Sequence, residues 1–135
     1  MKFVILIHSN PQPWAHPTSE HTREYQALPR EQQDALGAAW DRVVGEAQAN
    51  GEIVFACPLA DPAAARVYVH RGEPVATEGP YARAEEHLVG SEMCIRDSFV
   101  IDVASRERAE QIAAAFSCPG DTVELRPVMS PGPGA

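Results

Sequence analysis

The spacing of hydrophobic residues predicts strands at both ends of the chain and a long helix between them. Residues 3–7 are a continuous apolar run, which is typical of a strand buried on both faces in the middle of a sheet. Residues 30–50 place apolar side chains at i, i+3, i+4 and i+7, which predicts an amphipathic helix with its stripe on Leu36, Ala39, Trp40, Val43, Val44 and Ala47. Asn50 and Gly51 follow as a suitable helix stop.

The second half of the chain is also predicted to contain strands and one helix, with a β-hairpin among them. Residues 52–58 and 99–103 have the apolar pattern of further strands. In residues 122–128 polar and apolar side chains alternate, which predicts a strand with one solvent-exposed face. Between them, 66–70 and 75–77 flank a turn containing Gly72, which predicts a β-hairpin. Ser105 is a suitable N-cap for a helix that runs to Phe116. The proline-spaced segment 10–29 is predicted to be irregular, with a short helix within 19–27.

The resulting order, β-α-β-β-β-β-α-β, predicts an α+β fold of the ferredoxin-like sandwich type. Each long helix has a single apolar stripe, so both are expected to cover one face of an antiparallel sheet. The other face is then apolar and open, and a second copy of the chain is its simplest cover, which predicts a sheet-on-sheet homodimer. We expect one domain over residues 1–129 and a disordered Pro/Gly tail over 130–135.

Composition narrows the choice of partner and compartment. The 135 residues carry 11 basic and 19 acidic side chains, and the net charge of −8 argues against nucleic-acid binding. The three cysteines are an odd number without a Cys-x-x-Cys pair, so neither a disulfide framework nor a structural zinc site is expected. The apolar run at 3–7 is too short for the hydrophobic region of a signal peptide or for a membrane span. We therefore expect a cytoplasmic protein, and we expect it to need no metal or cofactor.

Candidate chemistry centres on residues 77–88, where a carboxylate and an imidazole flank a Gly-Pro pair. His87 is a candidate general acid or base, and Glu78 is its candidate partner. His8 is a third candidate because it ends the first strand, and ligands often bind where central strands end. Two of them have a structural alternative: His87 as a surface residue and Glu78 as a turn carboxylate. Among other residues, Trp14 is expected in a pocket wall, Trp40 in the core and Cys118 as an inert thiol.

Six motifs, taken together, resemble the YCII-related proteins, in the branch named for an Asp-Gly-Pro-Phe motif. The resemblance spans Met1 to about Met129 and is carried by the segments 52–62, 71–74, 77–81, 86–88, 99–103 and 123–128. It implies a dimeric, ferredoxin-like α/β barrel of mostly unassigned function, with a His/Asp pair proposed as the active site. Glu78 and Tyr81 stand where the motif has Asp and Phe.

Residues 91–98, Ser-Glu-Met-Cys-Ile-Arg-Asp-Ser, depart from that family. They are either a genuine insertion or a translated sequencing-adapter fragment. If they belong to the protein, they are expected to interrupt the strand and to loop out as a bulge or extended turn.

Two functions follow from the residues and the resemblance. One is a cofactor-independent enzyme that transfers protons on a small metabolite, such as a lactone or enol, in a pocket containing His8, Glu78 or His87. The other is a non-catalytic dimeric module that binds a small ligand or a transcription-related protein. The resemblance implies the transcriptional link, because members of this branch are often encoded near sigma factors.

Overall fold

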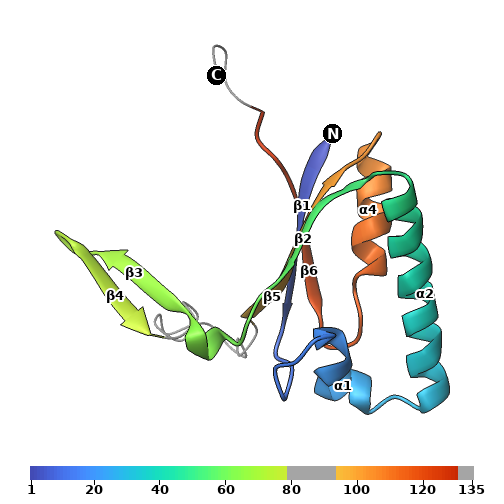
Figure 1. Cartoon of the computed structure of the whole chain (residues 1–135), viewed down its shortest axis with the longest axis horizontal. Coiled ribbons are helices and arrows are strands. Elements are labelled where there is room, and N and C mark those ends of the chain that lie inside the picture. The colour runs from blue at the N-terminus through green and yellow to red at the C-terminus, as the bar shows by residue number, and fades with distance from the viewer. Residues whose placement is uncertain (79–93, 131–135) are drawn as a thin grey trace.

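The chain is an α+β protein built on a four-stranded antiparallel sheet (Figure 1). The structure is a computed structural model that describes residues 1–78 and 94–130. Its α-helices and strands in chain order are β1 (Lys2–Ser9), α1 (Arg23–Gln26), α2 (Arg30–Ala49), β2 (Ile53–Pro58), β3 (Arg66–His70), β4 (Pro74–Glu78), β5 (Cys94–Asp102), α4 (Arg106–Ala115) and β6 (Thr122–Pro127). Short 3-10 helices precede α1 (η1, Thr18–His21) and β3 (η2, Pro62–Ala64).

The strand order of the main sheet is β2-β5-β1-β6, and every neighbouring pair is antiparallel. β1 is therefore an internal strand, as its apolar run predicts. Its burial alternates, however: Phe3, Ile5 and Ile7 are buried, whereas the residues between them are half-buried. The expectation of burial on both faces was wrong, because within the described residues helices cover only one face of the sheet.

Helices α2 and α4 lie on the same side of the sheet (Figure 1). The core forms there, between the inward side chains of β1 and β5 and the apolar stripe of α4. Phe99 stacks on Phe116 with ring centroids 4.5 Å apart. Ser105 caps α4 as predicted, since its hydroxyl accepts a hydrogen bond from the Arg108 backbone N–H at 3.2 Å. These features are compatible with a ferredoxin-like α+β arrangement.

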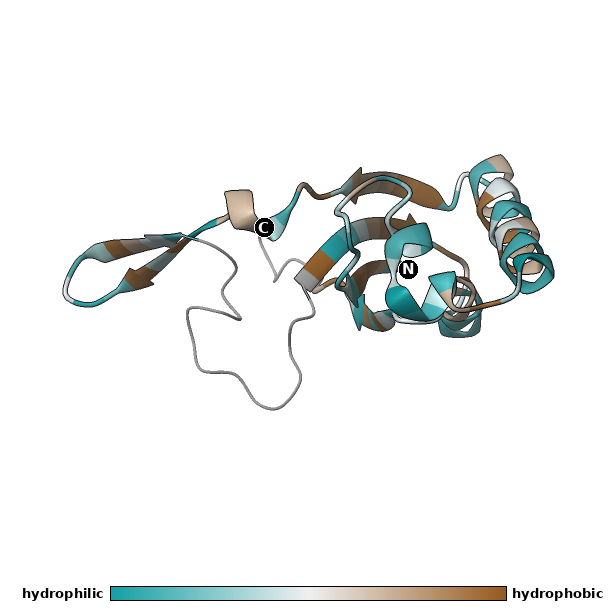
Figure 2. Cartoon of the chain, turned by 90° about the horizontal axis from the view of Figure 1, so that it is seen from below, coloured by the Kyte–Doolittle hydropathy of each residue, from teal (hydrophilic) through white to brown (hydrophobic). Residues whose placement is uncertain are grey.

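Strands β3 and β4 form a separate two-stranded sheet that projects away from the main sheet (Figures 1 and 2). The hairpin prediction is confirmed, and Gly72 in its turn has φ +77°, a conformation that glycine adopts without a steric cost. Tyr68 and Val75 on this hairpin are exposed.

Residues 94–98 extend β5 and do not loop out. Each of them except Arg96 has a partner on β1, and the register shifts between Ile7 and His8. Arg96 is thus the extra residue of a β-bulge. The expected bulge is present, but the expected interruption of the strand was wrong from residue 94 onward, because the polar side chains there find buried partners. The tail predicted for 130–135 lies outside the described residues from 131 on.

Candidate functional site

A cavity of about 380 Å³ lies between α2, the segment around η1 and the helix-covered face of the sheet. Its buried lining includes Asp97 and Phe99 of β5 together with Thr18 of η1, Val44 of α2 and Cys118. Its exposed lining residues come from the η1 segment, α2 and the end of β2. The aromatic and charged groups that line it are His16, Glu20, Tyr25, Trp40, Asp41, Arg96, Asp97 and Phe99. The volume is in the range of small-molecule pockets.

The cavity explains why the stripe of α2 is incompletely buried. Val44 and Ala47 are buried, whereas Leu36 and Trp40 are half-buried and line the open space. Trp40 packs against the edge of the core, where its ring makes an edge contact with Phe116 at a centroid distance of 6.0 Å. An amphipathic helix normally buries its stripe against its neighbours, so this incomplete contact leaves apolar surface for a ligand.

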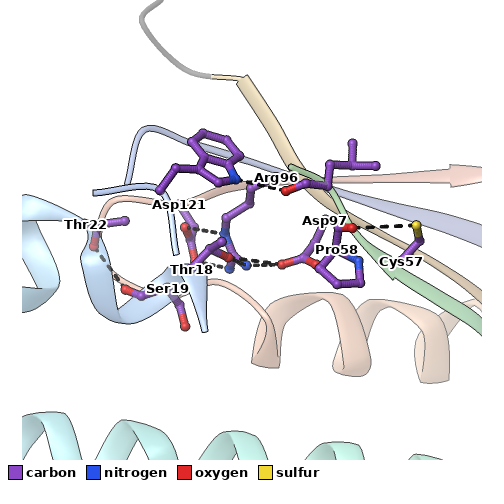
Figure 3. Close-up of polar contacts among 10 residues, drawn as sticks. Thr18, Ser19, Thr22, Cys57, Pro58, Arg96, Asp97 and Asp121 are labelled. Atoms are coloured by element: carbon purple, nitrogen blue, oxygen red, sulfur yellow. Dashed lines mark hydrogen bonds and ion pairs between the residues drawn. The ribbon is translucent and has the colours of Figure 1, made fainter. Parts of the chain in front are cut away.

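At the sheet end of the cavity lies a buried polar cluster of Arg96, Asp97, Asp121 and Thr18, which we call the Arg96 cluster (Figure 3). The guanidinium of Arg96 binds Asp121 through two hydrogen bonds, from Nε at 3.2 Å and from Nη2 at 2.9 Å. Its Nη1 donates both to Thr18 Oγ1 at 2.6 Å and to Asp97 Oδ2. Thr18 in turn donates to Asp97 Oδ2 at 3.3 Å.

The cluster places two buried carboxylates around one guanidinium. Arg96 and Asp97 are 5% and 6% exposed, and the side chain of Asp121 is completely buried. Burial raises the pKa of Asp97, and its interactions with Arg96, Thr18 and His16 lower that pKa only in part. Asp97 is therefore a carboxylate with increased basicity at the inner surface of a cavity.

Two other groups at the cavity are poorly suited to proton transfer. Burial and the nearby Glu20 raise the pKa of the Tyr25 hydroxyl, which donates to the Gln33 carbonyl at 3.3 Å. Burial and Asp121 raise the pKa of Cys118, so this thiol stays protonated near neutral pH. The low reactivity expected for Cys118 agrees with this environment.

The structure does not bring His8 and Glu78 together. His8 follows Ile7 on β1 and shares the open sheet face with Leu6, so it does not line the cavity. Glu78 is exposed at the end of β4, where it pairs with Arg66 at 3.4 Å across the hairpin. His87, with Tyr81, lies outside the described residues. The catalytic role of this set stays a prediction.

Trp40 packs against the core as predicted, whereas the pocket position predicted for Trp14 was wrong. Trp40 lines the cavity, whereas Trp14 does not and instead donates from Nε1 to the Leu59 carbonyl at 2.9 Å. The residues that sequence reasoning missed are Arg96 and Asp97. The available signal is the adjacent Arg-Asp pair two residues before the apolar pattern of residues 99–103, in a segment predicted to interrupt the strand.

Comparison with protein-family models finds none that matches the chain, and comparison with curated proteins finds no significant match. Over residues 1–78 and 94–130, no group of three or more His, Cys, Asp or Glu side chains is placed to hold a metal ion. None of the helices in this described part is long and apolar enough to cross a membrane.

Proposed function

We propose that this protein binds a small organic metabolite in the cavity and transfers a proton to or from it without a cofactor. The observation that carries the proposal is the position of Asp97, a buried carboxylate with a raised pKa at the inner surface of a cavity of about 380 Å³. A carboxylate whose pKa is raised toward the working pH is a stronger base, and burial is the usual means of raising it.

The reaction class that fits is proton transfer at a carbon next to a carbonyl group. Asp97 takes the proton, the electron pair of the broken C–H bond forms the enolate, and the same carboxyl group returns the proton to the substrate. Arg96 and Thr18 hold the Asp97 carboxylate in place. The imidazole of His16 also lines the cavity, interacts electrostatically with Asp97 and can supply a hydrogen bond to the substrate oxygen.

Membership of the YCII-related family and a ferredoxin-like fold are part of the same proposal. Their support is the order of the six sequence motifs, the strand order β2-β5-β1-β6 and the position of α2 and α4 on one side of the sheet. In this proposal the base is Asp97, and Glu78 on the hairpin belongs to a different surface.

The homodimer is also a proposal, supported by the open sheet face. Phe55 of β2 lies opposite Val100 of β5, which lies opposite Val4 of β1, so three apolar side chains form a row across the sheet. Phe55 is 57% exposed. A second copy of the chain would remove this row from water.

Hydrogen–deuterium exchange tests the enzymatic function. Small enolisable ketones and lactones, with and without an amino group, are incubated with the protein in D2O and followed by proton NMR. We expect faster loss of the signal next to the carbonyl for at least one compound. Asp97→Asn is expected to slow this exchange about 100-fold or more. Asp102→Asn, which changes an exposed carboxylate at the far end of β5, serves as the control and leaves exchange unchanged.

The other outcomes separate the two functions. A compound that raises the melting temperature without exchanging its protons would replace the enzyme with a non-catalytic ligand-binding module. The divergence of His8 and Glu78 favours this second candidate. If no compound in the panel binds or exchanges, the proposed function is wrong.

A further inference from the structure

The charges around the cavity are unbalanced, and this imbalance bears on the ligand. Three carboxylates line it: Asp97 is buried, whereas Glu20 and Asp41 are exposed. The basic side chains that line it are Arg96 and His16. Asp121, which binds Arg96 through both carboxylate oxygens, adds a fourth negative charge immediately behind the cavity.

Arg96 has little capacity to bind an anionic ligand. A guanidinium has five N–H donors, and four hydrogen bonds from Arg96 already go to Asp121, Asp97 and Thr18. Only one N–H donor of Arg96 remains for a carboxylate or phosphate that enters the cavity. Such an anion would also meet the negative charges of Asp97 and Asp121, which is unfavourable at low dielectric.

The cavity also offers aromatic surface next to its carboxylates. Trp40 and Phe99 line it from α2 and from β5. Aromatic faces attract organic cations, most strongly that of tryptophan, and they also pack against an apolar ligand body. A cation would supply the positive charge that the Arg96 cluster lacks, since one guanidinium there faces two carboxylates.

We propose that the ligand of this cavity is a small organic amine that binds as a cation, with its ammonium group on Asp97 and its apolar body against Trp40 and Phe99. This inference rests on the proposed function and specifies its substrate class. Glu20 and Asp41, at the exposed part of the lining, attract the cation as it enters.

Three probes of nearly equal shape test the proposal by isothermal titration calorimetry: phenethylamine, 2-phenylethanol and phenylacetate. We expect the amine to bind at least tenfold more tightly than the alcohol, and the carboxylate not to bind. Asp97→Asn is expected to weaken amine binding about tenfold or more, the loss typical of a hydrogen bond to a charged group, and to leave the alcohol unaffected. Asp102→Asn is the control and preserves the difference between the probes.

The pH dependence gives a second measurement that requires no variant. The groups facing Asp97 are Arg96 and Thr18 in direct contact, Asp121 behind Arg96, and His16. Acidification protonates Asp97 and removes the negative charge that holds the ammonium group, so the affinity for phenethylamine is expected to fall. Binding of phenylacetate as tight as that of phenethylamine, or binding of none of the three, overturns the amine proposal. The exchange experiment on neutral ketones and lactones still decides the proposed function independently.

Discussion

At the scale of single residues, the raised pKa of Asp97 makes a distinct contribution to how stability depends on pH. Its pKa is raised above the ordinary value of 3.8, mainly by burial. Between that value and the raised pKa, the unfolded chain has lost a proton that the folded chain keeps. The contribution of Asp97 to stability therefore falls as pH rises through this window, and the ionised carboxylate remains unfavourable above it.

Asp97→Asn imitates the protonated carboxyl group, and this equivalence gives a direct test. In urea unfolding, we expect the variant to match the parent protein near pH 4 and to become the more stable of the two as pH rises. Arg96 keeps its two hydrogen bonds to Asp121 in the variant, so its charge stays paired. Asp102→Asn removes an exposed ion pair with the N-terminus and should show no such gain. A variant that is less stable at neutral pH would show that the ionised form is favoured.

At the scale of elements, the sequence predicts what local periodicity determines. The stripe of α2, the Ser105 cap and the glycine turn of the hairpin each depend on residues within a few positions of one another. The start of β5 could not be predicted this way. Its Arg96 and Asp97 are polar, and they are buried because Asp121 and Thr18 come from distant parts of the chain. The candidate site could not be predicted from the sequence for the same reason, because its residues are far apart along the chain.

β5 also provides a test of the residues 91–98, because the candidate site depends on two of them. Trypsin cleaves after Arg83, Arg96 and Arg106, so the given sequence yields separate peptides 84–96 and 97–106. We expect both in a digest of the protein purified from its natural source, because residues 94–98 form a paired strand and a hydrogen-bonded cluster. A single peptide joining Gly90 directly to Phe99 would identify an adapter fragment. It would also remove Arg96 and Asp97, and with them the proposed site.

At the scale of the whole molecule, the two faces of the main sheet differ in what covers them. One face carries α2, α4 and the cavity, whereas the row Phe55, Val100 and Val4 lies on the other. The hairpin β3–β4 adds an exposed Tyr68, and an isolated two-stranded sheet is of marginal stability in water. Both features indicate that the chain alone leaves apolar surface that association would bury.

The proposed dimer predicts the effect of a charge on the open face. Phe55→Glu places a carboxylate in the middle of a sheet-on-sheet interface, where it would be buried without a partner. Light scattering coupled to size exclusion is expected to change from the mass of two chains to that of one, with the circular dichroism spectrum preserved because Phe55 lies outside the core. Ala39→Glu adds the same charge to an exposed position on α2 and should remain dimeric. A parent protein that elutes with the mass of one chain at high concentration would exclude the dimer and leave the cavity as a site within a single chain.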